Sequence, residues 1–532
     1  IEEYWFVTHL TTLLILCDNL QEWKRLTKLG DQATMIFPCE NIALEPQKDK
    51  IKIIANIFYS SKGKHGLEQE IFKRWNPKTK WGGFKEKLIS LETHPATLAW
   101  YIWDEPHAYK VSPMRMLERI NVFRKYGKTH PTFIADWYWR SHAEYNFICM
   151  GASVHYYPVF HDIIQLAEVW LDQRREIMAP MPVWFGPGAF RRRTLKENPT
   201  EWHFRFPTPE EMRLLVYMAI AHGAKGIIYF AYNIDPREPV YGVGLTDEPE
   251  AKNLWKEMGK INLELTLLGR LLAKGEVVSL AYIKGYSSHH PEFRYAVTPR
   301  QKVSWKAKPE VSSLICGTET MVIFLINHDY EWTKDGCFPN PIRNLTFELN
   351  LPNWFKPVDA FELNWNGLRK IAYSLKGKRA NFTIDRVETT KTIIITTDKN
   401  LRGQIEGERK RLIKKMEIET EEENSSLKIT SIDVLPSEEI SPDSEVTVVV
   451  HTNKKIKTFR IFTYKHWCNG NIPANFKHWG RNTYYLVGEI TPEGEGKAVI
   501  VTKNLPTGIY RFTAYVSEEK VRDPKDMVGK LS

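Results

Sequence analysis

The sequence contains few cysteines and no closely spaced pair of them. Six Cys in 532 residues exclude a disulfide-stabilised miniprotein, because such chains are short and rich in cysteine. No CxxC spacing occurs, so neither a zinc motif nor a dithiol redox motif is expected. Cys316 and Cys337 flank an expected hairpin and are compatible with a disulfide or with two separate thiols. We therefore expect no metal site and no cofactor.

Long apolar runs and a concentrated basic stripe are also absent. The most apolar stretches, residues 6–17 and 214–232, are short or interrupted by His, Lys and Gly, whereas a membrane-spanning helix needs about 20 apolar residues. The formal net charge is +10, but Lys and Arg are dispersed along the chain. Proteins that bind nucleic acid usually concentrate these residues on one face. We therefore expect neither a membrane span nor a nucleic-acid partner.

Apolar residues, by contrast, are plentiful enough for several cores. The chain is 42% hydrophobic and 12% aromatic, which excludes disorder as its main state. Its length exceeds that of one ordinary domain. Gln is scarce while Lys, Glu and Ile are abundant, a composition compatible with a heat-adapted source.

Strand-like and helix-like segments alternate along the first half of the chain. A helix is predicted over residues 210–222, with Thr208 as its cap and Pro209 in its first turn. The strand-like segments are residues 8–17, 33–38, 52–59, 97–103, 131–136, 147–157, 182–185 and 225–232. Eight such units in about 250 residues favour a (β/α)8 TIM barrel over residues 1–275. A doubly wound open sheet competes with this, but no GxGxxG follows the first strand.

The second half of the chain has a sequence pattern typical of β-strands. Residues 276–400 contain short alternating runs separated by turn residues, which favours a β-sandwich domain. Residues 401–425 are highly charged and are expected to form a linker or an exposed helix. Residues 426–532 alternate again and predict an Ig-like β-sandwich. The expected fold class is therefore α/β, a (β/α)8 barrel followed by C-terminal all-β sandwich domains.

Three Asn-X-Ser/Thr triplets lie in the second half, beginning at Asn344, Asn381 and Asn424. Such triplets are acceptor patterns for N-glycosylation. They favour an extracellular or cell-surface glycoprotein over a cytoplasmic protein.

In a (β/α)8 barrel the active site lies at the C-terminal ends of the strands. Here those ends carry carboxylates and aromatic rings, without a GxSxG elbow or a His/Cys cluster with metal spacing. The candidate catalytic residues are Asp104, Glu105 and Asp136, and the candidate substrate-binding residues are Glu40, Trp103, Trp137, Trp139, His155, Tyr156, Tyr157, Trp184 and Tyr232. Aromatic rings stack on the C–H faces of sugars, and glycosidic cleavage needs a carboxylic acid. The strand ends therefore point to a carbohydrate substrate or ligand.

Residues 100–106 read Trp-Tyr-Ile-Trp-Asp-Glu-Pro. They resemble the strand-four motif of the (β/α)8-barrel glycoside hydrolases related to β-galactosidases and cellulases. Residues 153–158 are similar to strand six of that superfamily, and residues 207–232 to its last helix and eighth strand. The family motif is Asn-Glu-Pro, and its Glu is the general acid/base. The resemblance implies that Glu105 is the proton donor.

Asp104 stands where the family has an Asn that contacts a sugar hydroxyl. Asp104 is compatible with that contact, with raising the proton affinity of Glu105 through its like charge, or with capping the segment that starts at Pro106. The sequence does not decide among these roles.

The sequence departs from the family at two strand ends. Retaining members carry a second Glu after strand seven, whereas residues 183–190 contain no carboxylate. His155 ends strand six, where relatives with Asp-Glu-Pro commonly have Asp. Substitutes for the second carboxylate are Asp136, Glu40 and Asp104, and we favour Asp136 as the base of an inverting reaction, in which the two carboxyls stand about 6.5–9.5 Å apart.

Two functions follow from these observations. The first is a glycoside hydrolase that cleaves an oligo- or polysaccharide by carboxylate acid/base catalysis. The alternative is a barrel that has lost its nucleophile and serves as a carbohydrate-binding or structural cell-surface protein. A barrel aldolase or lyase would need a Schiff-base Lys, and no strand end carries one.

Overall fold

The structure is a computed structural model that forms two compact units, residues 1–415 and 416–532. It describes residues 13–16, 33–38, 51–56, 97–126, 130–136, 143–145, 148–149, 151–157, 181–192, 205–230, 240–243, 248–278, 280–283, 309–333, 335–425, 427, 429–435, 445–464, 471–480, 483–502, 512–518, 520 and 528–531.

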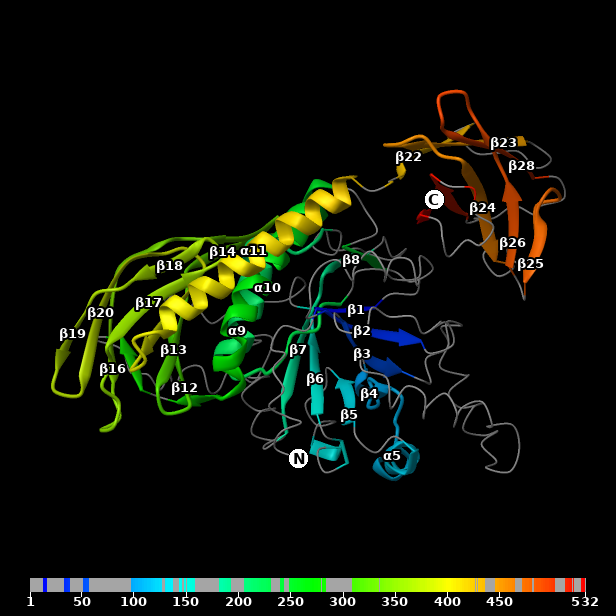
Figure 1. Cartoon of the computed structure of the whole chain (residues 1–532). Coiled ribbons are helices and arrows are strands. Elements are labelled where there is room, and N and C mark those ends of the chain that lie inside the picture. The colour runs from blue at the N-terminus through cyan, green and yellow to red at the C-terminus, as the bar shows by residue number, and fades with distance from the viewer. Residues whose placement is uncertain are drawn as a thin grey trace. The chain divides into compact units, whose positions relative to one another are not determined.

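A parallel sheet forms the first part of the first unit, and its strands follow one another in sequence order (Figure 1). The strands are β1 (Leu13–Leu16), β2 (Ala33–Pro38), β3 (Ile51–Asn56), β4 (Thr97–Asp104), β5 (Thr132–Asp136), β6 (Gly151–Tyr156) and β7 (Val183–Pro187). Residues 225–230 extend the sheet beyond β7, because Ile227 bridges Phe185 and Phe230 bridges Gly188, both in parallel. The sheet thus contains strands at seven of the eight predicted positions, and the eighth position contributes only these two isolated bridges.

Sequential parallel order is the arrangement that a succession of β-α units produces. Among the described residues, no pairing joins residues 225–230 to β1. The described part is therefore an α/β sheet, and its closure into a barrel stays a prediction.

The two faces of this sheet bury different side chains. Ile134 and Val154 share a core with Met116 of helix α5 (Pro113–Tyr126), and we call this side the helix face. Phe133 and Ala135 belong to a separate cluster on the opposite face. The split follows from the alternation of side chains along a strand.

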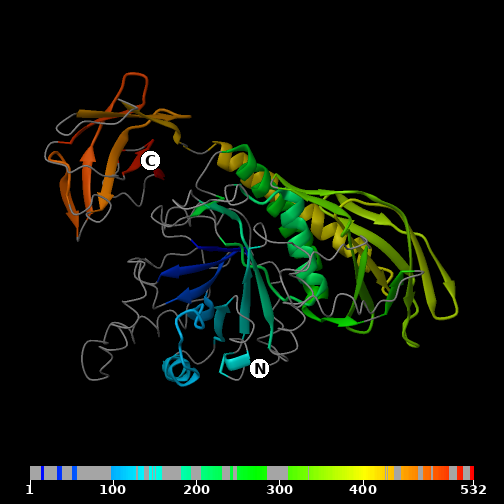
Figure 2. The ribbon, with the colours of Figure 1, turned by 180° about the vertical axis from the view of Figure 1, so that it is seen from behind.

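Helices α9 (Pro209–Ala221) and α10 (Pro249–Ala273) pack on each other and lie between the parallel sheet and a layer of antiparallel strands (Figure 2). The start of α9 confirms the predicted cap. The Thr208 side chain accepts from the Glu211 N–H, and the Glu211 carboxylate accepts from the Thr208 N–H. This reciprocal pair satisfies two amides that a helix start leaves without intrahelical partners.

The predicted β-sandwich is present as two antiparallel sheets. The first contains β10 (Gly275–Val278), β12 (Glu310–Cys316), β13 (Thr320–Ile326), β21 (Thr390–Thr396), β17 (Asp359–Asn364) and β18 (Gly367–Lys370). The second contains β11 (Ala281–Ile283), β16 (Ile342–Asn350), β20 (Arg379–Val387) and β19 (Tyr373–Lys376). Two short ribbons, β14 (Tyr330–Thr333) with β15 (Gly336–Pro339) and β8 (Phe190–Arg192) with β9 (Val240–Gly242), complete the unit.

Strand β13 is buried on both of its faces. Ile323 belongs to the core between the two sandwich sheets. Val322 and Phe324 belong instead to the core that contains α9 and α10. The sandwich and the helix layer of the α/β part therefore share one core.

Residues 401–425 form a single helix, α11 (Leu401–Ser425), which crosses the division between the units. Its first half is anchored, because Ile405 is buried in the core of the first unit and Arg402 pairs with Asp359 at 2.9 Å. This part of the charged segment is thus a docked helix and not a free linker.

The second unit consists of two antiparallel sheets around one core, as the sequence predicts. One sheet contains β22 (Ile429–Leu435), β23 (Glu445–Thr452), β28 (Gly496–Val501) and β27 (Glu489–Ile490), and the other contains β25 (Lys477–Gly480), β26 (Thr483–Val487), β24 (Thr458–Tyr464), β29 (Thr513–Ser517) and β30 (Val528–Leu531). Val448 and Val450 alternate inward against Ile461 and Val516.

The structure also bears on the two cysteines and on the described helices. Cys316 and Cys337 are separate buried thiols, so the disulfide alternative is wrong. None of the described helices is long and apolar enough to cross a membrane.

Candidate active site

The chain leaves β4 through a left-handed turn at Glu105. The φ angle of Glu105 is +47°, a backbone region that residues other than glycine seldom adopt. The Glu105 N–H donates to the Ala135 carbonyl at 2.8 Å, which ties the turn to the end of β5. Glu105 itself is half-buried. Strained residues of this kind cluster at active sites, and this one lies at the C-terminal end of a parallel strand.

A β-bulge in β4 comes directly before this turn. Tyr101 pairs with Phe133 and Trp103 pairs with Ile134, so two steps along β4 match one step along β5. After the bulge, Asp104 pairs with Ala135. Bulges redirect side chains and are common at barrel rims and beside active sites.

The bulge places Trp103 on the helix face of the sheet. Trp103 is 4% exposed, and the Arg119 guanidinium lies over its ring at 4.4 Å from the ring centroid. Arg119 comes from α5 and is itself buried. A ring covered in this way offers no open face for a sugar to stack on.

Asp136, the last residue of β5, is also on the helix face and is 0% exposed. Its Oδ2 accepts the His107 N–H at 3.2 Å. The structure therefore places Asp136 beside the turn that contains Glu105, and the Asp136 carboxylate accepts a hydrogen bond from the backbone of that turn.

The far end of the same turn is closed by Tyr145. Lys110 is a second left-handed residue, with φ +52°, and the Val111 N–H donates to the Pro106 carbonyl at 3.0 Å. The Tyr145 hydroxyl donates to the Val111 carbonyl. Burial raises the pKa of Tyr145 well above its usual range, and the charges of Glu144 and Asp136 add to this. The hydroxyl therefore stays protonated and remains a donor.

Three aromatic rings meet at the C-terminal ends of β6, β7 and residues 225–230. Tyr157 stacks on Phe230 with ring centroids 5.7 Å apart, and Phe190 stands edge-on to both rings, at 5.0 and 5.6 Å. A Cβ at Gly188 would come within 2.9 Å of the Phe190 and Tyr157 rings, so this close packing needs glycine there. Tyr157 and Phe230 are half-buried.

Tyr157 is among the predicted site residues, whereas Phe190 and Phe230 are not. Phe230 lies two positions before Tyr232 in the predicted eighth strand, and Phe190 lies three residues after the end of β7. Phenylalanine has no hydrogen-bonding group, so a strand-end pattern of carboxylates with Trp and Tyr does not include it.

Trp184 of β7 lies on the opposite face of the sheet from the helices. Its ring packs on Phe133 with centroids 5.0 Å apart. A Cβ at Gly226 would come within 2.7 Å of the Trp184 ring, so glycine at that position makes room for it. Trp184 is half-buried, at the edge of the cluster that contains Phe133 and Ala135.

The remaining predicted residues are placed only in part. His155 and Tyr156 belong to β6, where their backbone pairs with Gly186 and Pro187 of β7. The predicted residues outside the described part of the chain are Glu40, Trp137, Trp139 and Tyr232. Within the described part, no group of three or more His, Cys, Asp or Glu side chains is arranged to hold a metal ion.

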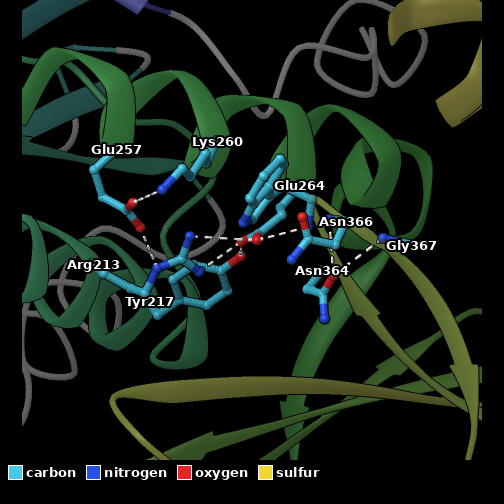
Figure 3. Close-up of polar contacts among 9 residues, drawn as sticks. Arg213, Tyr217, Glu257, Lys260, Glu264, Asn364, Asn366 and Gly367 are labelled. Atoms are coloured by element: carbon cyan, nitrogen blue, oxygen red, sulfur yellow. Dashed lines mark hydrogen bonds and ion pairs between the residues drawn. The ribbon is translucent and has the colours of Figure 1, made fainter. Parts of the chain in front are cut away.

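A second group of buried carboxylates lies between α9, α10 and the β17–β18 turn (Figure 3). Arg213 binds Glu257 at 2.5 Å and Glu264 at 2.8 Å. Glu264 also accepts the Tyr217 hydroxyl and, at 2.9 Å, the Trp365 N–H. Burial and the nearby Glu264 charge raise the pKa of Tyr217. Both carboxylates are paired with Arg213, so this network is not a candidate for acid/base catalysis. It joins α9 and α10 to the β17–β18 turn of the sandwich.

Comparisons with known proteins add names but no family. No family model matches the chain, and no curated protein matches it. Similar solved structures include one described as a glycoside hydrolase, with 9% identity, a TM-score of 0.46 and coverage of 73% of this chain and 92% of that one. Another is an α-L-fucosidase isoenzyme 2 from Paenibacillus thiaminolyticus, with 8% identity, a TM-score of 0.42 and coverage of 73% and 100%. A third is a glucosidase from Croceicoccus marinus, with 10% identity, a TM-score of 0.34 and coverage of 65% and 79%. At these TM-scores the likeness carries no argument about residues or activity.

Proposed function

We propose that this protein is a glycoside hydrolase that cleaves glycosidic bonds in an oligo- or polysaccharide, with Glu105 as the proton donor. The observation that carries the proposal is the conformation of Glu105. It is a half-buried carboxylic acid in a left-handed turn at the C-terminal end of a parallel strand, tied to the next strand by its own amide. A general acid must be held in a fixed position beside the leaving oxygen.

The architecture supports this assignment. Sequential parallel strands bring their C-terminal ends to one edge, and closure of the eight positions into a (β/α)8 barrel would gather those ends around a single site. The Tyr157–Phe230 pair at the same edge would give an apolar wall for a sugar ring. Asp104, adjacent to Glu105, would raise the proton affinity of Glu105 by its like charge, and Asp104 and Glu40 are the candidates for the second carboxylate.

The test is Glu105→Gln, assayed for release of reducing ends from a panel of oligo- and polysaccharides. The amide keeps the size of the side chain but cannot donate a proton from a carboxyl, so we expect a loss of about 10²–10⁴-fold. The variant's activity on aryl glycosides with acidic leaving groups should fall much less, since the departure of such a leaving group needs little protonation. Glu118→Gln, on the exposed side of α5, is the matched control. Full activity of Glu105→Gln would reject the proposal.

One observation favours the alternative of a carbohydrate-binding protein without turnover. Strand β7 and the three residues after it, Val183–Phe190, carry no carboxylate. A glycan-array screen that found tight binding, together with no hydrolysis of the bound glycans by the wild-type protein, would establish this alternative.

A further inference from the structure

We infer that Asp136 is a positioning residue for Glu105 and not the base of the reaction. Its carboxylate holds the turn that carries the proton donor. This inference rests on the proposed function of Glu105, and it replaces the role that the strand-end pattern alone suggests for Asp136.

The face of the sheet is the first argument. Ile134 and Asp136 are two residues apart in β5, so their side chains leave the strand on the same side. Ile134 belongs to the helix-face core, and so does Val154, the partner of Asp136 in β6. Asp136 is 0% exposed. A general base must reach the attacking water, and a fully buried carboxylate on the helix face lies away from the edge where a sugar would enter.

The hydrogen bonds are the second argument. The backbone amides of Glu105 and His107 donate hydrogen bonds to two consecutive residues of β5, Ala135 and Asp136. The Glu105 amide bonds the Ala135 carbonyl at 2.8 Å, and the His107 amide bonds the Asp136 carboxylate at 3.2 Å. Only Pro106 lies between these two attachment points. The backbone of Glu105 is thus held on β5 from both sides.

The strain at Glu105 explains why such attachment is needed. A left-handed non-glycine residue persists only where its surroundings overdetermine its conformation. Without the His107–Asp136 bond, Glu105 could relax toward an ordinary φ angle, and its carboxyl would move relative to the sheet edge. The carboxylate of Asp136 would therefore act on catalysis through backbone geometry.

Two substitutions at one position separate the roles. Asp136→Asn keeps an oxygen that can accept the His107 amide but cannot take a proton, whereas Asp136→Ala removes the acceptor. A positioning role predicts that the Asn variant loses less than about tenfold in kcat, because one hydrogen-bond acceptor replaces another. The Ala variant should lose distinctly more in kcat, and the shape of the pH–rate profile of the Asn variant should match that of the wild type. A base would make the Asn variant lose about 10²–10⁴-fold.

Amide hydrogen exchange supplies a readout that does not depend on turnover. We expect the His107 amide to exchange faster in Asp136→Ala and near the wild-type rate in Asp136→Asn. If Glu105→Gln is inactive and Asp136→Asn is equally inactive with its His107 amide still protected, the positioning role is overturned while the proposed function stands. If the wild type hydrolyses no glycan, the proposed function fails, and the exchange data alone decide whether Asp136 holds the turn. If Asp136→Ala does not fold, the Asn variant decides.

Discussion

At the scale of single residues, the backbone of Glu105 predicts a conflict between stability and activity. Its φ of +47° is unfavourable for a side chain with a Cβ but open to glycine. We expect Glu105→Gly to raise the free energy of unfolding by about 1 kcal/mol while abolishing hydrolysis. Urea unfolding and reducing-end assays measure the two effects. Lys110→Gly, at φ +52°, is the control and should stabilise without loss of activity. A less stable Glu105→Gly would show that the turn is not strained.

A second prediction at this scale concerns acid. Burial alone would raise the pKa of the Glu310 carboxyl, but the charge of His222 and hydrogen bonds from His222 and His328 outweigh it and hold the pKa well below its usual range. The two contacts are 3.1 and 2.8 Å long. A carboxyl with a lowered folded pKa stabilises the protein above its unfolded pKa of about 4.3, and this stability is lost as the pH falls further.

We therefore expect Glu310→Gln to destabilise the protein at pH 7 by about 1–3 kcal/mol. The difference from the wild type should shrink as the pH falls below about 4.3. Urea unfolding at a series of pH values measures it. Glu408→Gln, which breaks an open ion pair with Arg411 on α11, should change stability little at any pH. A wild-type-minus-variant difference that grew toward low pH would contradict this account of Glu310.

At the scale of elements, the ion network of α9 and α10 predicts a large effect of one arginine. Arg213→Ala would leave Glu257 and Glu264 buried without their shared cation. We expect it to lower the free energy of unfolding by about 3–5 kcal/mol, because an uncompensated buried charge is costly. Lys260→Met, which removes the more exposed partner of Glu257, should cost less than about 1 kcal/mol. Equal costs in urea unfolding would show that Arg213 is not the centre of the network.

The same elements show how far the sequence predicts the fold. Short apolar segments predict the strands of the parallel sheet, and Thr208 with Pro209 predicts the start of α9. The partners of α9 were not predictable, because its buried residues lie on nearly all of its sides and a pattern without a polar face does not say which layers cover it. The pairing of Arg213 with two glutamates on α10 depends on tertiary contact and leaves no short-range pattern.

The candidate site, like the fold, is predictable from the sequence only in part. The position of Glu105 after β4 follows from the strand pattern. The directions of its neighbours do not, because one bulge shifts the alternation of β4 and turns Trp103 to the helix face. Asp136 has the composition of a strand-end carboxylate and shares a face with Ile134. Phe133 on the other face is equally apolar, so the sequence does not show which face the helices cover. The sequence therefore predicts that these residues lie at strand ends, but not which of their side chains reach a ligand.

At the scale of the whole first unit, strand β13 has a consequence for how this protein can change. Because Phe324 serves the helix layer and Ile323 serves the sandwich interior, the sandwich is not an appended module with a surface of its own. A chain that lost it would uncover one flank of α9, a helix in which residues 214–221 are all buried. Exchange of the sandwich for another domain would therefore have to be matched by new side chains along α9. The sandwich and the α9 surface that it covers can change in evolution only together.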